Sequence, residues 1–327
     1  MDPDNKDQPK EFKNKTWIVD TLKNEIVSQF PEKFTNDPLE ADIIWFLAPW
    51  KYNYWSKYNL KYVKMDKEKW NQILLSKKVV FTMHHVDPQK IESLKEQFSF
   101  MRTYGNRIHA ICRNTQMSLE NYFPKDDIFS QKFWVNSSRF YQMPEHQKIN
   151  LRKKYNFNSQ SFLIGSFQKD SEGNTDLPKL SKGPDLFVKI IQDMLKTNKN
   201  IEVVLTGLRR NYLIKELEKI NIKYHYFNMV SLEELNELYN CLNLYLIPSR
   251  CEGGPYTIFE AGMSKTPLIS TNVGVAPELC HSESLFNADN WNSYKQAVPK
   301  VDFLYENVQR LSTDEYKEEF LNSLIED

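Results

Sequence analysis

The chain has 327 residues, with 43 lysine and arginine side chains against 43 aspartate and glutamate side chains, so its formal net charge is zero. A balanced charge argues against a general nucleic-acid-binding protein, which carries a basic excess. The length exceeds what one ordinary hydrophobic core holds and favours two domains. No apolar run in the sequence approaches the roughly 20 residues that cross a bilayer.

The cysteines and the start of the chain indicate a cytoplasmic setting. Four scattered cysteines without a C-x-x-C pair favour reduced thiols over a disulfide framework or a zinc site; they are Cys112, Cys241, Cys251 and Cys280. The polar N-terminus lacks the apolar core of a signal peptide, and we expect residues 1–12 to be disordered. Peripheral binding to a membrane stays an open alternative for a lipid-linked acceptor, although no basic amphipathic helix supports it.

Strand-like and helix-like segments alternate through the first half of the chain. Short runs of β-branched and aromatic residues predict strands over residues 16–20, 42–48, 78–83, 107–112 and 132–136. Helices are expected between them, for example over 88–98 and 115–122. The polar segment 145–160 is the expected boundary, so that residues 1–150 form a first, acceptor-side domain.

The second half repeats this alternation. Strands are predicted over 161–167, 201–207, 222–227, 242–248 and 267–271, and helices over 184–197, 212–220, 232–240 and 255–264. Such alternation implies parallel sheets with helices on both faces. We therefore expect an α/β protein with two Rossmann-like domains facing a cleft, the second spanning residues 151–300. Residues 301–327 are helical in pattern, and whether they return to the first domain is left open.

The most informative segment is PSRCEGGPYTIFEAG, residues 248–262, which follows an apolar strand-like run. Pro255 is suited to the first turn of a helix, and helix N-termini attract anions. Glu252 lies in the turn before that helix. Glu260 lies inside the helix, with its side chain leaning back toward the N-terminus. Two carboxylates beside an anion-binding helix end suit a ligand that carries phosphate and hydroxyl groups, such as a nucleotide sugar.

With its surroundings, this segment resembles the retaining glycosyltransferases of the GT-B fold, specifically glycosyltransferase family 4. The resemblance runs from about Gly165 to Leu279 and includes Lys182-Gly183, VSLEELNELYN, the 248–262 segment and TPLISTNVGVAPEL in order. The first half matches only loosely, because no glycine-rich turn follows residues 16–20. The resemblance implies a two-domain fold and a nucleoside-diphosphate sugar as donor.

The resemblance also implies roles for individual residues. Lys182 and, with less geometric specificity than an arginine, Lys169 would bind the donor phosphates. Glu260 would bind the ribose hydroxyls and Glu252 those of the donor sugar. The turn residues would bring backbone amides and one hydroxyl to the donor: Gly253, Gly254, Pro255, Tyr256 and Thr257. His84 or His85, after the strand 78–83, would lie near the donor sugar, and sequence alone does not separate the two.

Each of these residues has a plainer interpretation. The lysines are also consistent with solvated surface charges, the glutamates with helix capping or surface pairs, and the histidines with metal binding or packing. Arg209 and Arg210 could reach a nucleotide or face solvent. An aromatic group in the first half, Trp45, Trp50, Tyr52, Tyr54, Trp55, Tyr58 and Trp70, fits either a sugar platform or a loop packed on the core.

The leading hypothesis is a metal-independent, retaining glycosyltransferase that moves a sugar, of the hexosyl type, to a glycan, lipid-linked or other hydroxyl acceptor. No D-x-D follows a predicted strand, and the cationic groups with the helix amides would stabilise the leaving diphosphate. A GT-B-related nucleotide-sugar epimerase and a non-catalytic nucleotide-sugar-binding protein are the alternatives. The nucleotide base, the sugar, the acceptor, the linkage and the oligomeric state cannot be read from the sequence.

Overall fold

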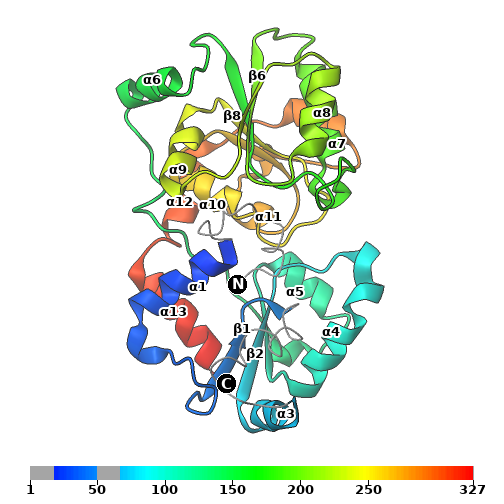
Figure 1. Ribbon diagram of the computed structural model, residues 1–327, viewed down its shortest axis with the longest axis vertical. Helices are drawn as coiled ribbons and strands as arrows, with labels where there is room; N and C mark the ends of the chain where they lie inside the picture. Colours follow the sequence, from blue (N-terminus) through cyan, green and yellow to red (C-terminus); the bar gives the residue numbers. More distant parts are fainter. Residues whose placement is uncertain (1–17, 50–66, 327) are drawn as a thin grey trace. The chain divides into compact units, whose positions relative to one another are not determined.

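The computed structural model describes residues 18–49 and 67–326 (Figure 1). The chain divides into two compact units, one of residues 1–133 with 317–327 and one of residues 134–316. The disorder expected over residues 1–12 lies outside the described residues, as do the aromatic residues from Trp50 to Tyr58.

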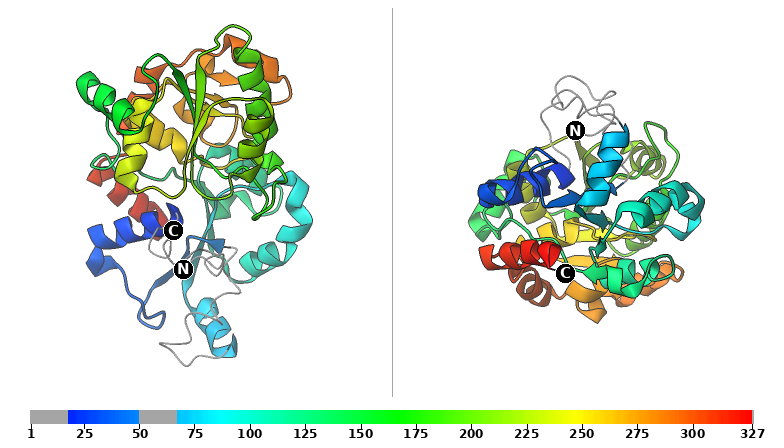
Figure 2. Two further views of the ribbon diagram at one scale, coloured as in Figure 1. Left: turned by 45° about the horizontal axis from the view of Figure 1, so that its top comes forward. Right: turned by 90° about the horizontal axis from the view of Figure 1, so that it is seen from below.

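The first unit is built around a parallel sheet in the order β1-β2-β3-β4. Its strands are β1 (Ile43–Phe46), β2 (Lys78–Met83), β3 (Arg107–Ala110) and β4 (Ile128–Ser130). Its helices are α1 (Ile18–Gln29), α3 (Lys67–Ser76), α4 (Ile91–Tyr104), α5 (Arg113–Leu119) and most of α13 (Asp314–Ile325), with 3-10 turns η3 (Pro31–Lys33), η5 (Pro88–Lys90) and η6 (Lys125–Asp127). Figures 1 and 2 show α4 and α5 on one side of the sheet and α1 and α13 on the other.

Alternating side chains of these strands serve two different layers, as the pleat of a strand requires. Val79, Phe81 and Met83 of β2 enter a core with residues of α3, α4 and α5. Residues one step out of phase face α13, whose fully buried Phe320 packs against Trp45 and His109. The C-terminal helix therefore completes the second layer of the first unit.

Two sequence predictions in this unit were wrong. Residues 18–20 begin helix α1 rather than a strand, because buried Val19, Leu22 and Ile26 recur at helical spacing along one face. Residues 132–136 form no strand. The N–H of Val135 instead bonds to Leu311 O at 3.1 Å, and the fourth strand of the sheet is Ile128–Ser130.

The second unit contains a larger parallel sheet, in the order β10-β9-β8-β5-β6-β7. Its strands are β5 (Phe162–Ser166), β6 (Ile201–Thr206), β7 (Tyr224–Phe227), β8 (Leu244–Ile247), β9 (Leu268–Thr271) and β10 (Leu285–Phe286). Its helices are α6 (Glu145–Lys154), α7 (Pro184–Met194), α8 (Asn211–Lys219), α9 (Leu232–Cys241), α10 (Thr257–Met263), α11 (Ala276–Leu279) and α12 (Val301–Gln309), with 3-10 turns η7 (Leu180–Lys182), η8 (Ser282–Ser284) and η9 (Trp291–Gln296).

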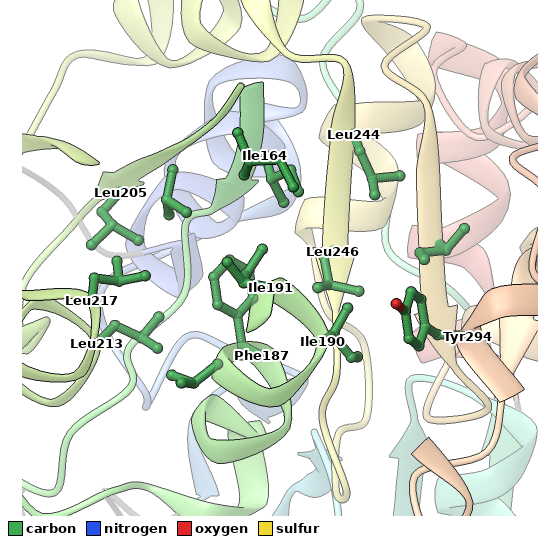
Figure 3. Close-up of a cluster of buried hydrophobic side chains, with 14 of the residues drawn as sticks. Ile164, Phe187, Ile190, Ile191, Leu205, Leu213, Leu217, Leu244, Leu246 and Tyr294 are labelled. Atoms are coloured by element: carbon green, nitrogen blue, oxygen red, sulfur yellow. The ribbon is translucent and has the colours of Figure 1, made fainter. Parts of the chain in front are cut away.

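The strand order of this sheet fixes where a ligand is expected. Counted along the chain from β5, the order is 3-2-1-4-5-6, that of a doubly wound dinucleotide-binding sheet, and it reverses between β5 and β8. Figure 3 shows the core on one face of the sheet, where Phe187 and Ile191 of α7 and Leu213 of α8 pack beneath the strands. Ligands of such sheets bind outside the carboxyl ends of the strands at the reversal point.

Candidate functional site

Two loops leave the carboxyl ends of β5 and β8, the neighbouring strands at the reversal point. The strands pair through Ile164 with Leu244 and Gly165 with Tyr245. The first loop runs from Phe167 to Gly183 and carries Lys169 and Lys182; the second runs from Pro248 to Tyr256 and carries Glu252. The sheet topology alone thus places most of the predicted donor-binding residues at one edge.

Lys182 and Glu252 form an ion pair between these loops. The Nζ of Lys182 lies 2.5 Å from Oε1 of Glu252, and Ser249 Oγ donates to the same oxygen at 3.3 Å. The Glu252 side chain is only 7% exposed and that of Lys182 23%. The side-chain amide of Gln168, after β5, donates to Lys182 O and to Ser249 Oγ, each at 3.3 Å. The sequence singled out these two charges separately, and the structure brings them together.

The backbone around this pair is held in a conformation that needs glycine. Gly183 has φ +63°, and a Cβ on it would lie 1.8 Å from the carbonyl oxygen of Pro248. The N–H groups of Arg250 and Cys251 both bond to Ser181 O, at 2.8 and 3.0 Å. The two loops are therefore in backbone contact at the point where their charged side chains meet.

The turn from Gly253 to Tyr256 leads directly into α10. That helix begins at Thr257, two residues later than predicted, and Ile258 N bonds back to Pro255 O at 2.8 Å. Tyr256 points its hydroxyl away from the turn, donating to Trp134 O at 2.7 Å. Within the part of the chain that the structure describes, neither Gly253 N–H nor Gly254 N–H forms a hydrogen bond. The described residues therefore leave the hydrogen-bonding capacity of these two amides unused.

Glu260 is buried in α10, at 6% exposure. The hydroxyl of Tyr239, from α9, donates to its Oε2 at 2.8 Å. Burial raises the pKa of Glu260 to about 7, and the Tyr239 hydrogen bond opposes that shift. The carboxyl group therefore changes its charge close to neutral pH.

A second ion pair, Asp170–Arg210, lies beneath the same edge and was not predicted from the sequence. Arg210 is 1% exposed and Asp170 2% exposed, and Arg210 Nε lies 3.1 Å from Asp170 Oδ2. Arg210 Nη2 also donates to Ser166 O at 2.7 Å. Burial raises the pKa of Asp170 and the charge of Arg210 opposes this. Arg210 thus does not face solvent; it fixes the start of the loop on which half-buried Lys169 lies.

The two histidines of the first unit have different surroundings. His84 is half-buried after β2, its Nε2 donates to Leu47 O at 2.9 Å, and its ring lies 5.8 Å from that of Phe133. Burial lowers the pKa of His84 to about 4. His85 is exposed. Trp45 and Trp70, the described members of the aromatic group, pack within the first unit, Trp70 in its core and Trp45 against Phe320.

Over residues 18–49 and 67–326, no group of three or more histidine, cysteine, aspartate or glutamate side chains is arranged to hold a metal ion. None of the helices in these ranges is both long and apolar enough to span a membrane.

Solved proteins share this architecture. HepE from Anabaena, in complex with UDP and glucose, is 13% identical, with a TM-score of 0.65 over 98% of this chain and 84% of that chain. Sucrose-phosphate synthase from Thermosynechococcus elongatus is 14% identical, with a TM-score of 0.64 over 97% and 79% of the two chains. The two parallel-sheet units and this likeness define an α/β protein of the GT-B fold. The predicted fold class is confirmed.

The family match falls almost entirely within the second unit. Residues 178–318 match the family described as "Glycosyl transferases group 1", so the chain carries a glycosyltransferase group 1 domain. The O-antigen biosynthesis glycosyltransferase WclY of Escherichia coli is 28% identical over 136 residues. That segment covers 41% of this chain and 35% of WclY, so the match spans little more than a third of that relative.

Proposed function

We propose that the protein is a retaining glycosyltransferase that transfers a sugar from a nucleoside-diphosphate sugar to a hydroxyl group of a glycan, a lipid-linked sugar or another acceptor. The observation that carries the proposal is the Lys182–Glu252 pair at the reversal point of a dinucleotide-type sheet. Buried Glu260 and the amides of Gly253 and Gly254 lie on the same turn and helix. The group 1 match over residues 178–318 supports the same assignment.

The charges of the site fit a diphosphate and a sugar. Lys182 exchanges Glu252 for an oxygen of the diphosphate, which releases the carboxylate to accept hydrogen bonds from sugar hydroxyls. The exchange costs little because each charged group keeps a polar partner before and after it. Lys169 adds positive charge at the same strand end, and Glu260 accepts from the ribose hydroxyls. Thr257, also expected at the donor, has its hydroxyl oxygen buried at the start of α10.

The proposed reaction breaks the bond between the anomeric carbon and the diphosphate oxygen and forms a bond from that carbon to the acceptor oxygen. The leaving phosphate takes the proton of the acceptor hydroxyl, so no side-chain base is required. Charge building up on the diphosphate is stabilised by the lysines and the backbone amides. The transition state has oxocarbenium character, and the nearby Glu252 carboxylate stabilises the positive charge that develops on the sugar.

A nucleotide screen tests the donor assignment. UDP, GDP, ADP and CMP, followed by their sugars, are added in thermal-unfolding experiments, because a ligand that binds only the folded state raises the melting temperature. We expect one nucleoside diphosphate to stabilise the protein. No stabilisation across the whole panel contradicts the proposal.

A glutamate substitution then separates an enzyme from a binding protein. Glu252→Gln is expected to lower donor turnover about 100-fold, while Glu233→Gln, at an exposed position of α9, leaves turnover unchanged. Wild-type protein that binds the nucleotide sugar but neither transfers nor hydrolyses it is a binding protein. Conversion of the donor sugar without any acceptor identifies an epimerase.

Three further expectations belong to this proposal. Independence of metal ions predicts full activity in EDTA. Participation of a first-unit histidine predicts reduced turnover in His84→Ala or His85→Ala. A lipid-linked acceptor predicts that activity rises with vesicles containing a polyprenyl-linked sugar, whereas a free glycan acceptor needs no vesicle.

A further inference from the structure

The carboxylate of Glu260 is held from one side only. The Tyr239 hydroxyl donates to Oε2 at 2.8 Å, whereas no described residue hydrogen-bonds Oε1. A carboxylate oxygen accepts more than one hydrogen bond. One oxygen of this buried group is therefore fixed within the protein and the other remains available to a ligand.

Tyr239 is itself fixed firmly enough to orient another side chain. Its side chain is fully buried, and Thr266 Oγ1 donates to its backbone oxygen at 2.9 Å. Its ring meets those of Phe167 and Tyr245 at centroid distances of 4.9 and 5.3 Å. A ring packed in this way places its hydroxyl at one position, so the donor to Glu260 is preorganised.

The surroundings of Glu260 leave this hydroxyl as its dominant polar partner. Tyr239 on α9 and Tyr245 on β8 are the neighbouring titratable groups, and burial, with a smaller contribution from the charge of Glu260, raises the pKa of both tyrosines. From α12, apolar Leu304 and Val308 pack against the helix at Gly262. Strand β9 contributes no titratable residue, and no described cationic side chain pairs with Glu260. The tyrosine therefore controls both the orientation of the carboxyl group and how readily it ionises.

We propose that Tyr239 is a positioning residue for the nucleotide: its hydroxyl holds Oε2 of Glu260 and thereby directs Oε1 to the ribose hydroxyls of the donor. The inference rests on the proposed function, which makes Glu260 the ribose ligand. It adds a residue that touches no substrate and acts through the carboxylate. Tyr239→Phe removes only the hydroxyl and keeps the packed ring.

The test compares ribose and dideoxyribose forms of one nucleotide. UDP, GDP and ADP, each with its 2′,3′-dideoxy form, are titrated calorimetrically into wild type, Tyr239→Phe and Tyr294→Phe. Tyr294 is a matched control, because its hydroxyl likewise donates to a carboxylate, Asp193 Oδ2, at 2.7 Å in the same unit. We expect Tyr239→Phe to weaken binding of the ribose form about fivefold to tenfold and binding of the dideoxy form hardly at all. The control is expected to bind both forms as wild type does.

The pH profile gives a second readout that lost packing would not change. Without the Tyr239 hydrogen bond, Glu260 ionises at higher pH, so the loss of ribose-nucleotide affinity on acidification moves to higher pH in Tyr239→Phe alone. Equal weakening of both nucleotide forms, or no weakening of either, overturns the role of Tyr239 and leaves the donor assignment intact. If no nucleoside diphosphate binds wild type, the proposed function fails and this inference fails with it.

Discussion

The two units bury polar side chains in different ways. In the first, Trp45 Nε1 donates to Thr82 Oγ1 at 2.8 Å, Thr82 Oγ1 lies 3.0 Å from His109 Nδ1, and His109 Nε2 donates to Gln131 O at 2.6 Å. This is a neutral chain of hydrogen bonds, since burial lowers the pKa of His109 to about 3. In the second unit, the polar groups at the strand ends include two charged pairs.

The difference separates polar groups that join packed layers from polar groups that lie where a ligand is expected. The neutral chain lies between the sheet and α13, where it joins packed layers. The charged pairs, Asp170–Arg210 and Lys182–Glu252, lie where a doubly wound sheet binds its ligand. Charges are costly to bury; Asp170 and Arg210 partner each other within the protein, whereas partly exposed Lys182 is the charge that a ligand can reach. Four changes can break or sharpen this contrast.

The largest expected effect comes from Asp170→Asn. The substitution leaves Arg210 buried without its carboxylate, and breaking a buried ion pair from one side costs about 3–5 kcal/mol. Urea unfolding measures the loss. Asp176→Asn is the control. Asp176 lies on the same loop as Asp170, and its exposed ion pair is with Lys215 of α8, so its loss is expected to cause no measurable change in stability. Equal stability of the two variants contradicts a structural role for the buried pair.

A smaller loss is expected from Gly183→Ala, where the added Cβ meets the Pro248 carbonyl. Backbone strain and the clash together are expected to cost about 3 kcal/mol and to weaken donor binding, since the change lies beside Lys182. Gly173→Ala is matched to it: φ is +57°, but no atom lies within 4 Å of the added Cβ. It should cost only about 1 kcal/mol with no change in donor affinity. Similar behaviour of the two variants shows that the loop contact is unimportant.

Lys182→Met probes the charge rather than the backbone. We expect kcat/KM for the donor to fall about 100-fold, as when one stabilising group is removed from a developing anion. Lys189→Met, at an exposed position of α7, should leave kcat/KM unaltered. If the affinity for the nucleoside diphosphate falls while kcat is unchanged, Lys182 stabilises the bound donor and the transition state equally.

Acidification should act oppositely on the two units. The folded pKa values of His84 and His109, about 4 and about 3, lie below the unfolded value of 6.5, so each histidine lowers the stability of the first unit by about 1 kcal/mol between pH 6.5 and 5.5. The folded pKa of Glu260, about 7, lies above its unfolded 4.5, so the second unit gains stability as pH falls through 7. Hydrogen exchange, corrected for its intrinsic pH dependence, reports each unit separately. Parallel changes in both units contradict the contrast.

The second unit was the more predictable part from sequence. Strands such as β6 and β8 are buried on both faces, so they are continuous apolar runs, and their predicted bounds differ from the observed ones by one or two residues. The two-residue strand β10 is too short to give a pattern, and it was missed. In the first unit, β-branched residues suggested a strand where the spacing of Val19, Leu22 and Ile26 forms a helix.

The sequence predicted those parts of the candidate site that lie within one short segment of the chain. The segment 248–262 stands out because a turn and a carboxylate follow a predicted strand, and Lys182 because it precedes a predicted helix and matches the family motif. Their roles toward a donor stay predictions. Asp170–Arg210 and Tyr239–Glu260 did not stand out, because each joins residues far apart in sequence. A lone tyrosine on a predicted helix is indistinguishable from any core aromatic until the fold brings its hydroxyl to a carboxylate.

The C-terminal helix affects the order in which the units can mature during synthesis. Lys78 Nζ donates to Ile325 O at 2.8 Å and Arg107 to Ser323 O at 3.0 Å, so side chains of β2 and β3 bond to residues that are made more than two hundred positions later. The second unit is continuous in sequence, from residue 134 to residue 316. On the ribosome, where N-terminal domains normally fold first, the later unit can close while the earlier one still exposes the face of its sheet that Phe320 covers.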